Sequence, residues 1–190
     1  MKRLLAALPL LILACLYFSN SPSESKVFMN REEALKTAFP DADKIEKLEL
    51  FLNGEQVKEI ESLSKSKLES KLFIVYEGKK AGETLGYAII DTHSLRTMTE
   101  TVMFVMNADG TLRQAEILAF FEPPEYMAGN NWIALFYGKS AQDSLRLGKD
   151  IPVITGATIT SDSLAQAVRR ALAIFRVGVL DAKKDKGVTE

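Results

Sequence analysis

The residues best suited to chemistry lie together in the sequence TGATIT, residues 155–160. Three threonine hydroxyls fall within these six positions, and Gly156 and Ala157 keep the middle of the segment small. An apolar run over residues 151–154 precedes the segment and predicts a strand, and an amphipathic helical pattern follows it. A turn that carries hydroxyls and leads into a helix N-terminus is a place where a phosphate group can bind.

Thr158 is the residue in this segment best suited to attachment of a phosphate, because its hydroxyl can be esterified. Gly156 and Ala157 would let a large partner approach the backbone. The helix that follows would point free N–H groups and the positive end of its dipole at the phosphate. The simpler alternative is an ordinary helix N-cap, for which Thr or Ser is a common choice. Further hydroxyls come from Thr155, Thr160 and Ser161.

Composition excludes several other chemistries. Lys plus Arg (24) and Asp plus Glu (25) nearly cancel, so nothing supports nucleic-acid binding. The single cysteine, Cys15, lies in an apolar leader, which excludes disulfides, iron–sulfur clusters and thiol catalysis in the folded part. His93 is the only histidine, so we expect no histidine-rich metal or haem site.

The N-terminus has the pattern of an export signal. Lys2 and Arg3 precede an uncharged apolar stretch over residues 4–18, which predicts a signal sequence or a membrane anchor. As a helix this stretch would span about 22 Å, less than the hydrocarbon core of a bilayer. A polar linker follows over residues 19–30. We therefore expect an exported, membrane-anchored or periplasmic (extracytoplasmic) protein.

Strand and turn signals dominate the middle of the chain, and helical patterns lie on both sides of it. The fold class predicted is α+β, an antiparallel sheet with flanking helices, in one domain over residues 31–180 with a charged tail over 181–190. The predicted helices cover residues 31–39 (after Asn30), 57–72 and 160 or 161 onward, ended by Gly178. The predicted strands cover residues 45–52, 72–76, 85–90, 101–106 and 112–121, with turns at Asn53-Gly54, residues 77–80 and residues 107–110.

Two predicted loops carry polar groups. Residues 91–97 gather His93, Arg96 and three hydroxyls, and residues 122–127 form a stiff diproline segment with acids and an aromatic ring. Glu122 and Glu125 could form a general acid/base pair, but the sequence supplies no nucleophile or metal to accompany them. Gly138-Lys139-Ser140 is not a P-loop, because Ile133 stands where the first glycine is required. The sole tryptophan, Trp132, could be a core residue or could stack on a ligand.

Thr155 to Ser161, reading TGATITS, resembles the [ST]GAT signature of the FMN-binding domain family. That family includes FMN-carrying components of the Rnf complex (its G subunit) and of the sodium-pumping NADH:quinone reductase (its C subunit), and this chain resembles a small exported member. The resemblance implies an FMN-binding domain fold with FMN joined covalently through its phosphate to Thr158. It also implies a dedicated FMN transferase, which uses FAD and magnesium, for maturation.

Other site residues follow from the same resemblance. Glu122 and Tyr126 occupy an acid-and-proline loop that faces the flavin in relatives, and His93 and Arg96 lie in a loop similar to one in small exported members. Relatives commonly carry an aspartate three residues before the motif, where this chain has Pro152; its nearest acid on that side is Asp150.

The function expected is that of an extracytoplasmic electron-transfer flavoprotein, a redox carrier subunit and not a stand-alone enzyme. Its expected partners are membrane or exported redox proteins with haem or iron–sulfur centres. Two alternatives stay open. The first is a non-flavinylated binding or sensory module of the same fold at the membrane surface, which the proline at position 152 favours. The second is an exported hydrolase that uses Glu122, Glu125 or His93.

Overall fold

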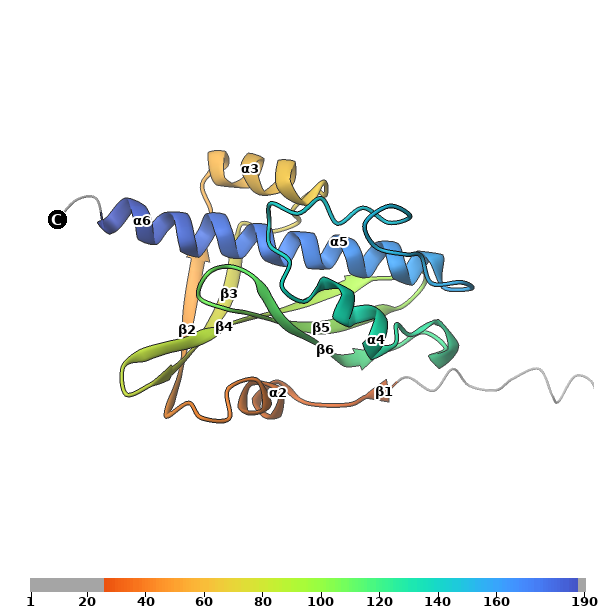
Figure 1. The fold of residues 1–190 in the computed structure, drawn as a ribbon, viewed down its shortest axis with the longest axis horizontal. Coiled ribbons are helices and arrows are strands. Elements are labelled where there is room, and N and C mark those ends of the chain that lie inside the picture. Colours follow the sequence, from red (N-terminus) through yellow and green to blue (C-terminus); the bar gives the residue numbers. More distant parts are fainter. Residues whose placement is uncertain (1–25, 188–190) are drawn as a thin grey trace, which may run out of the picture.

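A computed structural model describes residues 26–187 of the chain (Figure 1). The predicted leader, most of the predicted linker and the last three residues of the predicted tail lie outside the described residues. Within the described part, no helix is both long and apolar enough to cross a membrane.

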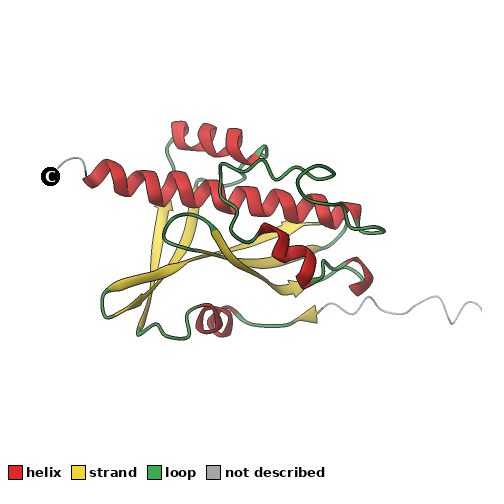
Figure 2. Cartoon of the chain, viewed as in Figure 1, coloured by secondary structure: helices red, strands yellow, loops and turns green. Residues whose placement is uncertain are grey.

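One antiparallel sheet forms the centre of the fold, as the sequence predicted (Figure 2). It has six strands, one more than predicted, because the short β1 pairs with β6. The order across the sheet is β1-β6-β5-β4-β3-β2, so consecutive strands from β2 to β6 are hydrogen-bonded neighbours. Antiparallel neighbours need only short turns between them, which suits the closely spaced strand signals. The strands are β1 (Lys26–Val27), β2 (Lys44–Phe51), β3 (Leu72–Lys80), β4 (Glu83–Ser94), β5 (Thr99–Met106) and β6 (Leu112–Phe120).

Helices cover both faces of the sheet. Figure 1 shows α3 and α5 over one face and α2 against the other. The α-helices are α2 (Arg31–Ala38), α3 (Gly54–Ser64), α4 (Asn130–Ile133), α5 (Thr158–Phe175) and α6 (Ala182–Gly187). Short 3₁₀ helices, η1 (Pro124–Tyr126) and η2 (Ala134–Phe136), flank α4, and a π-helical segment, η3 (Arg176–Asp181), joins α5 to α6.

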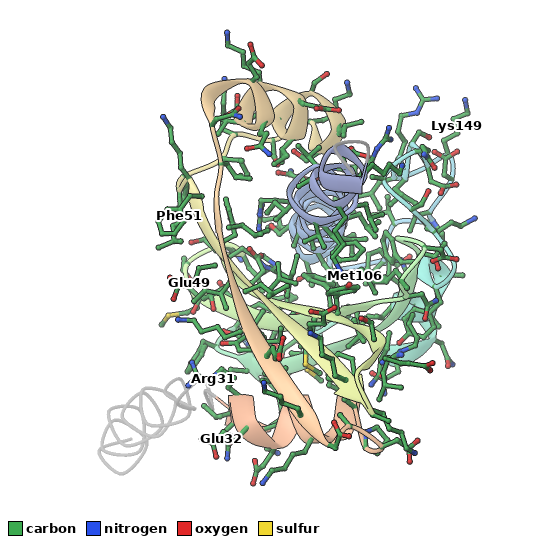
Figure 3. The ribbon with its side chains drawn as sticks, turned by 90° about the vertical axis from the view of Figure 1, so that its left-hand side faces the viewer. Arg31, Glu32, Glu49, Phe51, Met106 and Lys149 are labelled. Atoms are coloured by element: carbon green, nitrogen blue, oxygen red, sulfur yellow. The ribbon has the colours of Figure 1, made fainter. Side chains whose placement is uncertain are left out.

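Alternating side chains divide the sheet between two cores. Val102, Phe104 and Met106 of β5 pack in the large core with α5, whereas Met103 and Val105 pack in the smaller core with α2. This period-two alternation is the signature of a strand covered on both sides. In Figure 3, Met106 lies in the interior, while Phe51, which is 74% exposed, projects outward from edge strand β2.

The last helix shows the predicted apolar stripe, with Leu164, Val168 and Phe175 fully buried against the sheet. Its predicted end at Gly178 is wrong, because the helical path continues through η3 into α6. A Cβ atom at Gly178 would lie 2.8 Å from the Leu50 side chain, so the glycine permits close packing on β2 and does not terminate a helix.

The local predictions around α3 also need correction. Asn53-Gly54 is not a hairpin turn, because Asn53 is the N-cap of α3. Its side chain accepts from the Gln56 N–H at 2.9 Å, and Gln56 Oε1 accepts from the Asn53 N–H at 3.0 Å, which completes a capping box. The helix ends at Ser64, before the predicted residue 72, and the turn predicted over residues 77–80 lies beyond them, at Ala81-Gly82.

Candidate functional site

A pocket of about 310 Å³ lies at the N-terminal end of α5. Three separate segments form its wall: the turn between β4 and β5, the segment after β6, and the TGATIT motif. Its volume falls at the lower end of the range for small-molecule sites. The lining residues are Leu95, Arg96, Glu122, Tyr126, Gly156, Ala157, Thr158, Ile159 and Thr160.

Most of the site residues predicted from the sequence therefore meet in one place. Arg96, Glu122, Tyr126 and the motif residues 156–158 and 160 all line this pocket. The lining does not include His93, Thr155 or Ser161. Leu95 and Ile159 were missed by sequence reasoning, although each is adjacent to a predicted site residue; an apolar side chain in a polar segment was the available signal.

The motif lies in a turn that leads directly into α5. Gly156 has φ +83°, a left-handed conformation that favours glycine, and open space surrounds the position where a Cβ would lie. The turn is closed by a 3.1 Å hydrogen bond from the Ala157 N–H to the Ile154 carbonyl. The backbone conformation is therefore the structural reason for glycine here. The strand predicted over residues 151–154 is wrong, because only Ile151 makes a bridge, to Leu147.

The N-terminus of α5 has no side-chain cap. The helix begins at Thr158, two or three residues earlier than predicted, and Ala157 at the N-cap position has no side chain that can accept a hydrogen bond. The exposed Thr158 side chain thus lies in the first turn of an 18-residue helix, where orphan N–H groups and the positive end of the macrodipole attract an anion. This arrangement can hold a phosphate.

Ser161 does not line the pocket; its side chain supports the motif by hydrogen bonds on the buried side. Its fully buried hydroxyl donates to the Ala157 carbonyl at 3.0 Å and accepts from the Ile154 N–H at 2.9 Å. The same residue thus ties both ends of the TGA turn to the helix. The hydroxyls of Thr158 and Ser161 have different surroundings, one exposed at the pocket and one internal.

Glu122 fixes the opposite wall. Its Oε1 accepts from the Thr97 N–H at 2.6 Å, the Thr97 hydroxyl at 3.1 Å and the Met98 N–H at 2.8 Å. The backbone N–H groups of Thr97 and Met98 hold the pKa of Glu122 below its usual value. The carboxylate is therefore ionised at neutral pH and positions the turn that carries Arg96.

The segment before the motif is anchored by Trp132. Its indole Nε1 donates to the Pro152 carbonyl at 2.7 Å, and its ring packs edge-on against Phe136, with 5.2 Å between centroids. Neither alternative from the sequence describes it fully: it does not line the pocket, and its role is to brace the approach to the motif. Asp150 accepts hydrogen bonds from Ser144 and from the Arg146 N–H, so it shapes the loop that precedes Pro152.

His93 lies elsewhere, and the predicted loop over residues 91–97 is largely strand. Asp91 through Ser94 belong to β4 and pair with β5 up to Ser94–Thr99, leaving only residues 95–98 as the turn. The polar side chains of Asp91, Thr92 and His93 are compatible with a strand because each of the three has a polar partner there; the Thr92 and Thr101 hydroxyls, for example, are 2.9 Å apart. His93 lines a second hollow of about 500 Å³.

Residues 97–173 match the FMN-binding domain family. By this match, residues 97–173 are similar to an FMN-binding domain. The matched segment includes Glu122, Tyr126 and the whole TGATIT motif, and Arg96 lies directly before it. The pocket fits that assignment, because it combines an uncapped helix N-terminus with a cavity lined largely by apolar and hydroxyl groups.

Two individual proteins are similar to this chain. The G subunit of the Na⁺-translocating ferredoxin:NAD⁺ oxidoreductase complex from Acetobacterium woodii is 30% identical over 117 residues. That alignment covers 56% of this chain and 56% of the relative, so the chain spans about half the length of the relative. The crystal structure of Shewanella oneidensis NqrC superimposes with a TM-score of 0.55 and 13% identity, covering 82% of this chain and 90% of NqrC. The NqrC match shows that the two chains share a fold.

Proposed function

We propose that this chain is an extracytoplasmic electron-transfer flavoprotein in which FMN is attached through its phosphate to the Thr158 hydroxyl. The observation that carries the proposal is the placement of Thr158: an exposed hydroxyl in the uncapped first turn of α5, at the wall of the pocket. The match to the FMN-binding domain family supports the identity of the cofactor.

Each wall of the pocket has a role in this proposal. The first-turn N–H groups of α5 and the exposed Arg96 guanidinium would stabilise the phosphate, since both present positive charge. Tyr126 and Leu95 would contact the flavin ring system, because they supply aromatic and apolar surface to the pocket. When bound, FMN supplies the redox chemistry, and the protein supplies attachment, orientation and electrostatics.

The attachment needs a maturation enzyme that transfers the FMN moiety of FAD to Thr158. In that transfer the threonine oxygen forms a new bond to the FMN phosphorus, AMP leaves, and the hydroxyl proton is released. The redox partners proposed are membrane or exported proteins with haem or iron–sulfur centres. The similarity to one component of a Na⁺-translocating oxidoreductase complex supports partners of this class.

The second candidate is a non-flavinylated binding module of the same fold. Pro152 favours it, because the position three residues before the motif offers the transferase no acid. The hydrolase alternative loses support, because Glu122 and His93 line different hollows and Glu125 lines neither of these two.

The test is to express the chain together with an FMN transferase and to examine a denaturing gel under ultraviolet light. The wild-type band is expected to fluoresce, and the intact mass to rise by one FMN less one water. Thr158→Ala should abolish both signals, and the matched variant Thr160→Ala, which is nearly buried, should retain them. A non-fluorescent wild-type protein of unmodified mass contradicts the proposal, and loss of the label in Thr160→Ala alone contradicts the choice of residue.

A further inference from the structure

Four ionisable side chains form a cluster between the sheet and α5, outside the FMN pocket. Asp91 and His93 come from β4, Glu100 from β5 and Arg170 from α5. Their side chains are 18%, 9%, 0% and 17% exposed, respectively. Groups of this kind are seldom so buried unless they are paired with one another.

The contacts run in a line from Arg170 to Glu100. Arg170 Nη2 lies 2.6 Å from Asp91 Oδ2, and His93 Nδ1 lies 2.9 Å from the same oxygen. On the far side of the ring, His93 Nε2 lies 3.4 Å from Glu100 Oε2. Among the described residues, neither Nε2 nor either Glu100 oxygen has a hydrogen bond of good geometry. The ion pair with His93 is therefore the main compensation for Glu100.

The charges balance only with one extra proton. Two carboxylates and one guanidinium sum to −1, and a buried charge without compensation costs several kcal/mol. One proton bound by His93 brings the sum of the cluster to zero. Other charged groups near this site, Lys67 and Glu69, are exposed on the rim of the second hollow and are well solvated.

We infer that Asp91, His93, Glu100 and Arg170 form a one-proton binding site behind the FMN pocket, and that the affinity of this site for its proton depends on the charge held in the pocket. The second half of this inference rests on the proposed function. The first half does not, because it concerns only side chains of this chain. The second hollow, which His93 lines, would let solvent supply and accept the proton.

The electrostatic environment favours the protonated form of the histidine. Burial lowers the pKa of His93, but the contacts with Asp91 and Glu100 outweigh burial, and the net pKa is raised above the ordinary value. For Asp91, burial raises the pKa, but His93 and Arg170 outweigh it, so this carboxyl stays ionised. A raised histidine pKa means that this stabilisation is fully present below about pH 6.5 and is lost as the pH rises through the folded value.

The proton site and the pocket share one hairpin. His93 pairs with Glu100 across β4 and β5, Ser94 pairs with Thr99, and the turn of residues 95–98 follows at once. That turn carries Leu95 and Arg96 to the pocket wall. Two residues of strand span about 7 Å, so the pocket wall at Leu95 lies within about one Debye length of His93 along the backbone, about 8 Å in physiological salt. A negative charge added in the pocket therefore raises the affinity of His93 for its proton.

The first experiment uses the unflavinylated chain. Because His93 is the only histidine, its ring signals in the proton NMR spectrum are unique, and their shift with pH gives its pKa directly. We expect a midpoint above about 6.5, and a loss of at least about tenfold in proton affinity in Glu100→Gln. Glu69→Gln, on the rim of the same hollow, is the matched control and should change the affinity by less than about twofold.

A wild-type midpoint at or below the ordinary histidine value overturns the one-proton site, and so does a folded Glu100→Gln whose midpoint is unchanged. If Glu100→Gln does not fold, the wild-type midpoint decides alone. The second experiment repeats the titration on flavinylated chain, oxidised and after reduction with dithionite. Reduction should raise the proton affinity of His93 by about threefold or more. An equal midpoint in both states overturns the linkage, whereas absence of an FMN adduct is a failure of the proposed function only and leaves the first experiment intact.

Discussion

The N-termini of α3 and α5 differ in whether a side chain accepts hydrogen bonds from their first backbone N–H groups. At α3, the Asn53 side chain accepts from the N–H groups of Glu55 and Gln56, and a capping box closes around them. At α5, the N-cap is Ala157, which has no acceptor, and the first turn opens on the pocket. The difference is that the first N–H groups of α5 have no side-chain acceptor within the helix start and keep their capacity for an external one, as the proposed phosphate attachment requires.

The same contrast holds for α2. Its N-cap Asn30 forms a second capping box with Glu33, with distances of 3.0 and 3.1 Å. Both capped helices are short, 8 and 11 residues, and carry no part of the pocket. The 18-residue α5 has a long apolar stripe in the core, so its stability does not depend on a cap.

The largest stability effect is expected at Ser161, whose hydroxyl supports the turn before the uncapped N-terminus of α5. Ser161→Ala removes the hydroxyl that bonds Ala157 and Ile154, leaves the Ile154 N–H without its acceptor, and should lower the free energy of unfolding by about 1–3 kcal/mol. FMN attachment to Thr158 should also fall, because the turn loses its support. Urea denaturation and gel fluorescence measure the two effects. The control is Ser163→Ala, half-buried on the same helix, for which a change of about 0.5 kcal/mol or less is expected.

A smaller effect is expected at the capped start. Asn53→Ala should lower the free energy of unfolding by about 1 kcal/mol, since two N–H groups of α3 lose their acceptor. FMN attachment should be unchanged, because α3 carries no part of the pocket. Asn53→Asp keeps a capping oxygen and should restore most of the stability in thermal unfolding. If Asn53→Ala impaired attachment as much as Ser161→Ala does, the contrast between the two starts would be wrong.

The smallest stability effect is expected at Arg96, which is exposed and lines the same pocket as the first turn of α5. Arg96→Gln should change the free energy of unfolding by less than about 0.5 kcal/mol. In flavinylated protein, Arg96→Gln should make reduction of the flavin less favourable by about 0.5 kcal/mol per electron, because a positive charge near the cofactor is lost. The reduction potential should therefore fall. Redox titration measures this shift, which should shrink with added salt and be absent in Arg96→Lys. Equal shifts in both variants would show that charge is not the cause.

Elements with strong local patterns were predicted correctly. The α5 stripe, the hairpin turn over residues 107–110 and the β5 and β6 strands all carry periodic apolar residues or turn residues at short range. The wrong predictions share a physical reason. Asn53-Gly54 suits a turn and a helix start equally well, and here Asn53 caps α3. A glycine such as Gly178 can end a helix or can allow close packing, and here Leu50 packs against it. Long-range packing decided between the options.

For the site, the sequence by itself determined the local chemistry: small residues, hydroxyls and a helix start within TGATIT, with no second histidine and no cysteine outside the apolar leader to compete with it. Only the tertiary structure decided which distant groups meet it. Glu122 reaches Thr97 across 25 residues, and Arg170 reaches Asp91 across 79. Those contacts depend on strand register and on how α5 lies on the sheet. A local pattern does not contain that information, because closing such long loops is driven by burial of the whole core.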